Sequence, residues 1–293
     1  MNSNVIIYSM PELPEVQTVV SDLQELVASQ TLEKIVINDP KVWFHSSLQP
    51  KYFTGRQLRH VDRRGKYIVY NFGDIHLVQH LRMTGKMLLS DAKEIPHNII
   101  KANSLQLRLK LIFNNVELVF YDPRRFGTMT AVIDLDAYFK SKQLAPELYS
   151  NEPQLALDHY LAKVDYSNRP IKSTILDQSI ICGAGNIYAD EALHRAGVHP
   201  STPTNTLLSS QHQAIFAHLK EVMREAILKR GTSAADYLDL NGNPGVFKQY
   251  LKVYKRKDEL CKTCDRTRIC RIKIAGRSSH YCPKCQPFTK TND

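Results

Sequence analysis

The sequence predicts an α+β protein with a β-rich N-terminal domain that carries one helix, a helical domain, and a small cysteine-rich module at its C-terminal end. Three observations predict this fold class. Short runs rich in β-branched and aromatic residues dominate residues 11–135. From about residue 145 the apolar residues follow helical spacing instead. Five of the six cysteines crowd into residues 261–285. The 293 residues are enough for two or three domains with at least one sizeable core.

One helix is expected near the N-terminus, over the segment EVQTVVSDLQELVAS that begins at Glu15. Its apolar residues recur at the spacing of an amphipathic helix. Pro14 falls in the first turn, where its missing N–H leaves no helical hydrogen bond unmade. The apolar stripe consists of Val16, Val19, Val20, Leu23, Leu26 and Val27.

Five strand-like runs follow this helix, and a β-sandwich or a barrel over residues 11–137 is the expected result. In the fourth run the leucines alternate with polar residues, and this period of two predicts leucines in the core and polar side chains in solvent. Asn114 and Asn115 predict a turn before the fifth run. The runs cover residues 31–39, 65–72, 75–81, 104–113 and 116–122. The alternation involves Leu105, Leu107, Leu109 and Leu111 against Gln106, Arg108 and Lys110.

The second domain, expected over residues 145–240, contains one clear helix within residues 209–231. Ser210 and Gln213 have the spacing of a capping box at its start, and Gly231 is the expected stop. The segment NGNPG, residues 241–245, predicts a loop. The apolar stripe of the helix consists of Ile215, Phe216, Leu219, Val222, Met223, Ala226 and Ile227.

The cysteine-rich module, residues 250–288, has the spacing of a four-cysteine zinc site. Its two C-x2-C pairs are separated by residues 265–281, within the usual window for such sites. Four thiolates around one ion form a closed tetrahedral site, so one structural zinc is expected. A module of this size buries too little surface to fold without such support. The expected ligands are Cys261, Cys264, Cys282 and Cys285.

Two further features of the cysteines bear on this interpretation. Cys270 breaks the spacing and is interpreted as a spare thiol, and Cys182 stands apart with no assigned role. Between the pairs, Gly276 predicts a tight turn that places Arg277 at or near the tip of a β-hairpin. A basic hairpin tip can contact phosphate, although an arginine on a solvated loop is the plainer interpretation of this residue alone.

The net charge of +10 favours a polyanionic partner without settling the fold. A basic protein with a merely solvated surface is the alternative. The chain shows no apolar run of membrane-spanning length and no pattern of a secretory signal, so a cytoplasmic location is expected. Clustered cysteines in a cytoplasmic chain indicate metal binding rather than disulfides.

Six motifs in order make the chain resemble the formamidopyrimidine-DNA glycosylase family, the bacterial Fpg or MutM type. They are MPELPEV, RRGKYIVY, HLRMTGKM, YDPRRFG, ICGAGNIYADEAL and AGRSSHYCPKCQ, and they run from Met10 to about Gln286. The resemblance implies a β-sandwich domain, a helix–two-turn–helix domain and a zinc finger. It implies a monomeric base-excision repair enzyme that acts on double-stranded DNA with oxidised bases or abasic sites. A dinucleotide-binding loop is excluded for GAGNIYADEAL because its third glycine and the surrounding βαβ unit are absent.

The resemblance assigns the chemistry to four residues. Pro11 matches the proline whose secondary amine attacks C1′ of the deoxyribose and forms a Schiff base, and Glu12 matches the carboxyl group that donates a proton. Lys66 matches the lysine that assists β-elimination and contacts phosphate. Arg277 matches the zinc-finger arginine of δ-elimination. Glu15 either supports this site or only favours the start of its helix.

Nine residues, MNSNVIIYS, precede Met10 and conflict with this chemistry. An internal proline nitrogen is an amide whose lone pair is delocalised, so it is not nucleophilic. We expect that synthesis starts at Met10 and that removal of this methionine exposes Pro11, so that residues 1–10 are absent from the mature protein. The alternative is a longer chain that is inactive until it is processed.

The resemblance also assigns contacts with DNA. Met83, Arg124 and Phe126 match the three residues that fill the hole left by a flipped base. Core packing is the alternative for Met83 and Phe126. Asn186 starts a helix whose N-terminal end is expected to meet a phosphate. Lys172 and Tyr254 are further expected phosphate contacts.

Two departures and three rival functions accompany this hypothesis. The segment KANSLQLRL replaces a His-Asp-His-like stretch, which removes one expected phosphate contact, and Arg82 stands where a small residue is expected. The rivals are an oxidised-pyrimidine glycosylase of the endonuclease VIII type, a catalytically silent binder of damaged DNA, and a general zinc-ribbon protein. The exact lesion, the preferred opposite base and the true start are not fixed by the sequence.

Overall fold

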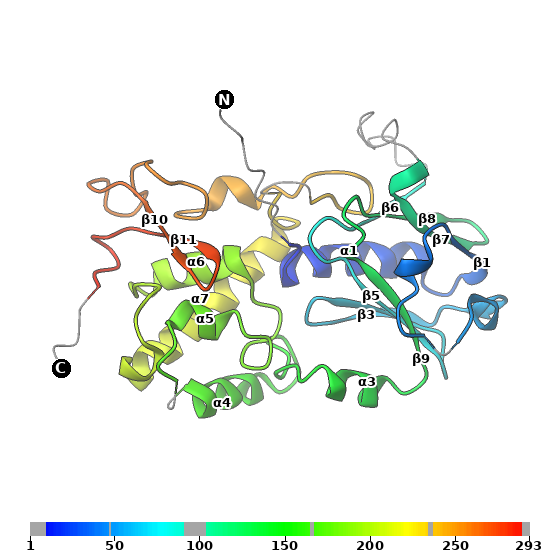
Figure 1. The fold of residues 1–293 in the computed structure, drawn as a ribbon, viewed down its shortest axis with the longest axis horizontal. Coiled ribbons are helices and arrows are strands. Elements are labelled where there is room, and N and C mark those ends of the chain that lie inside the picture. The colour runs from blue at the N-terminus through cyan, green and yellow to red at the C-terminus, as the bar shows by residue number, and fades with distance from the viewer. Residues whose placement is uncertain (1–9, 47, 91–103, 165–166, 234–236, 289–293) are drawn as a thin grey trace. The chain divides into compact units, whose positions relative to one another are not determined.

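The computed structural model describes residues 10–46, 48–90, 104–164, 167–233 and 237–288. The chain forms two compact units (Figure 1). Unit 1 consists of residues 1–142 and 227–248, and unit 2 consists of residues 143–226 and 249–293. The residues just after the long helix of the second domain therefore fold with the N-terminal sheets, and the cysteine module folds with the helices.

Unit 1 contains two antiparallel sheets and one long helix. The five-stranded sheet has the order β2-β1-β7-β8-β6, and the four-stranded sheet has the order β3-β4-β5-β9. One core takes side chains from both sheets and from helix α1 (Leu13–Val27), which confirms the expected sandwich. The strands are β1 (Thr31–Ile37), β2 (Arg56–Gln57), β3 (His60–Arg64), β4 (Tyr67–Asn71), β5 (His76–His80), β6 (Lys86–Leu89), β7 (Leu107–Phe113), β8 (Glu117–Tyr121) and β9 (Thr128–Val132).

Helix α1 forms where its stripe predicted it, with proline in the first turn. Its apolar face is buried, and β3 and β4 lie against it (Figure 1). A short helix, α3 (Leu135–Ser141), follows β9, and Asp134 caps it by accepting from Ala137 N. Single turns of 3-10 helix, η1 (Pro40–Val42) and η2 (Pro50–Phe53), lie in the connection between β1 and β2.

The predicted alternation in the fourth run is wrong at its first half. Leu105 lies in a 3-10 turn, η3 (Ser104–Gln106), and is 75% exposed, whereas Arg108 is buried. The register of β7 against β8 shifts between Leu107 and Leu109, so the side chains before the shift change faces. Arg108 is satisfied inside because its Nε donates to the carbonyl of Asp122 at 2.7 Å.

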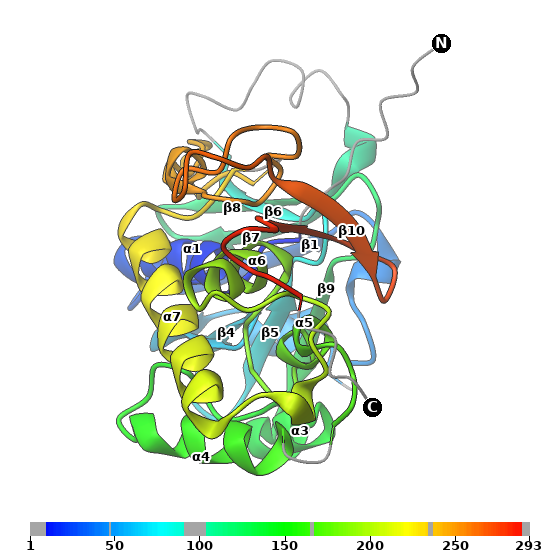
Figure 2. The same ribbon diagram turned by 90° about the vertical axis from the view of Figure 1, so that its left-hand side faces the viewer.

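Unit 2 combines helices with a two-stranded hairpin. Its helices are α4 (Pro153–Val164), α5 (Ile171–Ile175), α6 (Asn186–Arg195) and α7 (Ser209–Leu228), with α7 ending at the border of unit 1. Further single turns are η4 (Thr204–Thr206) and η5 (Phe247–Tyr250), the latter at the border of the two units. The hairpin consists of β10 (Cys270–Ile274) and β11 (Arg277–Tyr281), and β11 lies alongside α6 (Figure 2).

The start of α7 differs from its prediction, whereas its buried stripe is confirmed apart from the half-buried Ile227. The helix begins at Ser209, and Gln211 Oε1 accepts from Leu208 N at 2.8 Å. The predicted pair of Ser210 and Gln213 therefore does not cap the helix, because the two capping positions lie two residues earlier, at Leu208 and Gln211. No helix in the described part of the chain combines the length and the apolar character that a membrane crossing requires.

Candidate active site

The N-terminus of α1 is fixed by Glu15. Its Oε2 accepts from Glu12 N at 2.8 Å, and the two residues form a capping box in which each side chain faces the other's backbone. Pro11 and Glu12 are both buried. The backbone of the predicted nucleophile and acid therefore has one conformation, set by the first turn of the helix.

Glu15 also holds a second segment of unit 1 against this turn. Its Oε1 accepts from Thr232 N at 2.7 Å, and Tyr237 Oη lies 3.3 Å from the Glu15 carbonyl, to which it donates. Gly231, with a φ of +82°, lies so close that a Cβ there would be 3.0 Å from Glu15 Cγ. Glu15 therefore does more than start the helix, because it attaches the segment at Thr232 to the first turn of α1, and Gly231 permits the close approach.

Lys66 lies in the tight turn between β3 and β4, and its side chain is buried. Arg63 fixes this turn to α1: its Nη1 donates to the carbonyl of Gly65 at 2.9 Å, and its Nε donates to Gln17 Oε1 at 2.9 Å. Three of the four predicted catalytic residues, Pro11, Glu12 and Lys66, thus belong to one unit, and α1 and β3 position them.

His80 is a functional candidate that the sequence did not single out. It is buried on β5, and Arg82 N donates to its Nδ1 at 3.0 Å. Burial holds the pKa of His80 well below its usual range, and the charges of Arg82 and Lys66 lower this pKa further. A neutral His80 imidazole therefore adds no second positive charge beside Lys66.

Met83, Arg124 and Phe126, predicted as one group, do lie together. The guanidinium carbon of Arg124 lies 4.7 Å from the centre of the Phe126 ring, and Arg124 Nη1 lies 3.6 Å from Met83 Sδ. Phe126 is 48% exposed, so these side chains are not core. The alternative of plain packing is therefore not supported for Phe126.

Asp122 positions this group, a role that no sequence pattern indicated. Its Oδ1 accepts from Thr84 Oγ1, and its Oδ2 accepts from Gly127 N at 2.6 Å. A Cβ on Gly127 would lie 2.4 Å from Phe120 Cζ, and one on Gly85 would lie 2.3 Å from the Leu81 carbonyl oxygen. The two loops can meet over Phe120 only because both positions are glycine.

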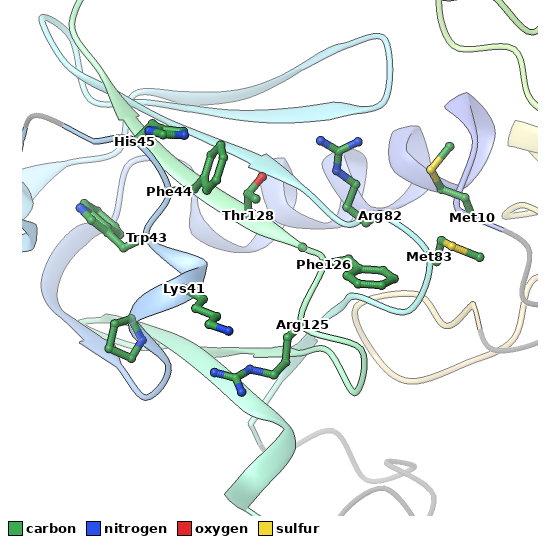
Figure 3. Close-up of a pocket in the computed structure, with 12 residues that line it drawn as sticks. Met10, Lys41, Trp43, Phe44, His45, Arg82, Met83, Arg125, Phe126 and Thr128 are labelled. Atoms are coloured by element: carbon green, nitrogen blue, oxygen red, sulfur yellow. The ribbon is translucent and has the colours of Figure 1, made fainter.

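A cavity of about 730 Å³, called here the aromatic cavity, opens beside these loops (Figure 3). In Figure 3 Met10 and Met83 lie at one end of it, and Trp43 and His45 lie toward the other. The lining residues are Met10, Pro40, Lys41, Trp43, Phe44, His45, Arg82, Met83, Arg125, Phe126, Gly127 and Thr128.

The remaining predicted residues lie in unit 2. Arg277 is the first residue of β11, directly after a turn in which Ala275 and Gly276 both have positive φ. That conformation is the usual two-residue hairpin turn, and it confirms the predicted place of the exposed Arg277. Asn186 is the first residue of α6, after Gly185 as N-cap. The Tyr254 ring is buried, and its centre lies 5.2 Å from the centre of the His280 ring.

Lys172 does not have the surroundings that a phosphate contact requires. Its side chain is fully buried, with Nζ 2.6 Å from Asp190 Oδ1 and 2.8 Å from the Ser278 carbonyl oxygen. Asp190 Oδ2 in turn accepts from His280 N at 2.9 Å. In this structure Lys172 therefore connects α5 and α6 to the hairpin, and the prediction of a direct phosphate contact gains no support.

Glu191, next to Asp190, anchors the segment that leads into the cysteine module. Its carboxylate accepts from three successive backbone N–H groups, those of Lys252, Val253 and Tyr254, at 2.9 Å each. Burial raises the pKa of Glu191, while the three N–H donors lower it. Asp190 and Glu191 both belong to the motif GAGNIYADEAL. Their structural roles could not be predicted from the motif, because the backbone N–H groups that donate to their side chains lie 61 or more residues away in the chain.

The four cysteines of the two C-x2-C pairs converge as predicted. Their sulfur atoms all lie within 4.8 Å of one another, and the Cys261–Cys285 and Cys264–Cys282 Sγ distances are both 3.8 Å. A tetrahedron with Zn–S bonds of about 2.3 Å has sulfur atoms about 3.8 Å apart. The thiolates therefore fit one metal ion, whereas Cys270 lies outside this group at the start of β10.

Comparisons with known proteins agree with this geometry. The family models for the formamidopyrimidine-DNA glycosylase N-terminal domain and H2TH domain match residues 10–129 and 144–237. Formamidopyrimidine-DNA glycosylase from Listeria innocua is 35% identical over 283 residues, covering 94% of this chain and 100% of the relative. The Bacillus subtilis enzyme is 36% identical over 284 residues, covering 94% and 99%.

Solved structures give the same result. A mutant of Lactococcus lactis Fpg in complex with Fapy-dG-containing DNA superposes with a TM-score of 0.84 at 32% identity, covering 95% of this chain and 100% of that one. MutM (Fpg) from Thermus thermophilus gives 0.83 at 35% identity, covering 96% and 100%.

The protein is thus a DNA glycosylase, an enzyme class of DNA repair. The two-sheet unit, the helical unit and the four-cysteine hairpin all agree with this class. Within that class, the chain belongs to the bacterial formamidopyrimidine-DNA glycosylase family.

Proposed function

We propose that this chain is a bifunctional DNA glycosylase and AP lyase that removes oxidised purines, such as 8-oxoguanine and formamidopyrimidines, from double-stranded DNA. The observation that carries the proposal is the fixed first turn of α1, where Glu15 holds Glu12 beside Pro11 at the start of the family match. The proposed substrate class also agrees with the relative from Lactococcus lactis, whose DNA ligand contains Fapy-dG.

The first step forms a bond between the Pro11 nitrogen and C1′ of the damaged nucleotide. The bond from C1′ to the base breaks, and the base leaves with that electron pair. Loss of the proline N–H and opening of the C1′–O4′ bond produce an iminium ion. Glu12 supplies the proton that the departing base or the sugar oxygen takes up.

The iminium ion then withdraws electrons from the sugar. Removal of a C2′ proton expels the 3′ phosphate by β-elimination, and a second elimination expels the 5′ phosphate. Lys66 assists the first elimination, and Arg277 assists the second by binding phosphate. The fixed turn at Gly65 and the hairpin turn at Gly276 support these roles, because each presents its cationic residue on a defined backbone.

Reaching C1′ requires the damaged nucleotide to leave the base stack. Met83 and Phe126 take its place, and Arg124 hydrogen-bonds the orphaned base. The mutual contacts of these three side chains support a common role. Asn186 binds a backbone phosphate at the N-terminus of α6, where unpaired N–H groups favour anions. Tyr254 is buried, like Lys172, so the proposal does not rely on it.

One zinc ion would be held by Cys261, Cys264, Cys282 and Cys285, and its role is structural because all four positions around it are protein sulfur. The ion stabilises the base of the hairpin that carries Arg277. Mass spectrometry of the native protein is expected to show one zinc per chain.

The test is a panel of duplexes with single lesions, treated with the chain that begins at Pro11. We expect release of 8-oxoguanine and formamidopyrimidine bases with β,δ-elimination products. Glu12→Gln should slow base release by about 10²-fold or more while the lesion duplex still binds. Preferential release of oxidised pyrimidines would instead support the endonuclease VIII type. Tight binding without any release would support the silent binder.

A further inference from the structure

The aromatic cavity combines two kinds of side chain that fit a nucleotide. Trp43, Phe44 and Phe126 supply ring surfaces, and Lys41 and Arg82 supply positive charge. Phe44 is 45% exposed, so its ring is available to a ligand. None of the residues that line the cavity is acidic. Aromatic surface next to cationic side chains is the combination that binds single-stranded nucleic acid without strong sequence preference.

The charge of the cavity is not cancelled by the fold. Arg125 is neutralised by Asp39, with Nε–Oδ2 at 2.6 Å and Nη2–Oδ1 at 2.8 Å. The hydrogen bonds from Arg125 lower the pKa of Asp39, so this carboxylate stays charged, and both of its oxygens accept from Arg125. Across the described residues, Lys41 and Arg82 make no ion pair with a carboxylate. The cavity therefore retains positive charge that a phosphate can complement.

Both arginines that line the cavity also have an unusual backbone conformation. Arg82 and Arg125 have φ values of +57° and +60°, in the left-handed region that costs a non-glycine residue about 1 kcal/mol or more. Both side chains line the cavity. The fold thus accepts local strain at two cationic residues that line the cavity.

We propose that the aromatic cavity binds the DNA strand opposite the lesion, with one base against Phe44 and its flanking phosphate on Lys41 and Arg82. This inference rests on the proposed function. Arg124, which hydrogen-bonds the orphaned base in that proposal, lies over the Phe126 ring, and Phe126 also lines the cavity. The next nucleotides of the orphaned strand therefore meet the cavity. Its volume is within the range of roughly 300–1,000 Å³ that is typical of ligand sites.

The test measures binding to a duplex that carries an uncleavable tetrahydrofuran in place of the lesion. Wild type, Lys41→Ala and Phe44→Ala are compared, each as residues 1–293 and as the chain that begins at Pro11. Lys51→Ala is the control, because Lys51 is exposed on the same connection but does not line the cavity. In matched duplexes, single phosphates near the lesion position are replaced by neutral methylphosphonates, on either strand in turn.

We expect Lys41→Ala to weaken binding by about five-fold and to lower the slope of log affinity against log salt by about 0.9. One methylphosphonate on the opposite strand should weaken wild type to a similar extent but should not weaken Lys41→Ala further. Phe44→Ala should weaken binding about five-fold or more through lost stacking. Lys51→Ala should stay within two-fold of wild type.

Independent, additive losses for Lys41→Ala and every opposite-strand methylphosphonate would overturn the inference. Coupling of Lys41 to a phosphate on the lesion strand would also overturn it, since the cavity would then hold the damaged strand. Failure of wild type to prefer the tetrahydrofuran duplex over undamaged duplex would instead refute the proposed function, so the two failures are distinguishable.

Discussion

Glu12 and Glu15 illustrate how the surroundings divide the roles of two identical side chains. Both are buried in the first turn of α1, but Glu15 accepts from two backbone N–H groups, those of Glu12 and Thr232. The Glu12 side chain faces the backbone of its own turn in the capping box, whereas Glu15 also holds the backbone at Thr232. We therefore propose that Glu15 positions the turn and that proton donation falls to Glu12.

Glu15→Ala is therefore expected to lower the free energy of unfolding by about 2–4 kcal/mol, because two buried N–H groups lose their acceptor. Urea unfolding measures this value. Glu25→Ala, on an exposed position of the same helix, is the matched control and should change stability by less than about 0.5 kcal/mol. Equal effects of the two substitutions would show that the capping contacts do not stabilise the fold.

A second prediction concerns Gly127. In Gly127→Ala the new Cβ would lie 2.4 Å from Phe120 Cζ, so the loop that carries Phe126 must shift, at a cost of about 1–3 kcal/mol. Thermal unfolding should show the loss, and adding Phe120→Leu should recover part of it by removing the clashing ring atom. A double variant whose loss equals the sum of the two single losses would argue against this clash.

At the scale of single residues, the sequence predicted which side chains lie together better than it predicted their burial. The grouping of Met83, Arg124 and Phe126 followed from the motifs and is seen in the contacts. The burial of Lys172 could not be predicted, because one of its partners, the Ser278 carbonyl, is 106 residues away in the chain. Periodicity reports only on neighbours within one element.

At the scale of elements, the hairpin of β10 and β11 depends on support from outside. An isolated two-stranded hairpin is only marginally stable in water. Here Lys172 of α5 bonds the Ser278 carbonyl, and Asp190 of α6 accepts from His280 N. The strand that begins with Arg277 is thus attached to two helices along its length.

Lys172→Met tests this support. It leaves Asp190 as a buried charge without its partner, which is expected to cost about 3–5 kcal/mol. Hydrogen exchange measured by mass spectrometry should become faster in residues 275–281. Lys163→Met, on an exposed position of α4, is the control. Unchanged exchange in the hairpin of Lys172→Met would contradict the proposed attachment.

Prediction of helices and strands succeeded where the element is long and has one continuous apolar face. The stripes of α1 and α7 were read correctly, as was the hairpin turn before Arg277. The strands β2, β3, β6 and β9 were missed. β3 is largely charged in sequence, and β2 and β6 are short, whereas β9 is as long as the predicted β4 and β8. The start of α7 was misplaced because it depends on which side chain accepts from the N-cap N–H group, and here Gln211 accepts from Leu208 N.

At the scale of the whole molecule, buried histidines make stability depend on pH. Burial lowers the pKa of His76 and, more strongly, of His80 in unit 1, and those of His194 and His199 in unit 2. In the unfolded chain these groups regain a pKa near 6.5. As the pH falls below that value, the unfolded state takes up protons that the folded state does not.

The free energy of unfolding should therefore fall between about pH 6.5 and pH 5, by up to about 1.4 kcal/mol per pH unit for each such histidine. Urea unfolding at several pH values measures this slope, and His80→Gln should make it shallower. A slope that is unchanged in His80→Gln would show that this side chain does not titrate as its burial implies.

Borohydride trapping tests whether the Pro11 nitrogen forms the bond to the sugar. The chain of residues 1–293 and the chain that begins at Pro11 are each mixed with an 8-oxoguanine duplex and borohydride, and the cross-linked peptide is identified by mass. Only the chain with a free Pro11 amine should be trapped, and the DNA should be attached to Pro11. Equal trapping of the chain in which Met10 still precedes Pro11, or attachment to any other residue, would contradict this role of Pro11.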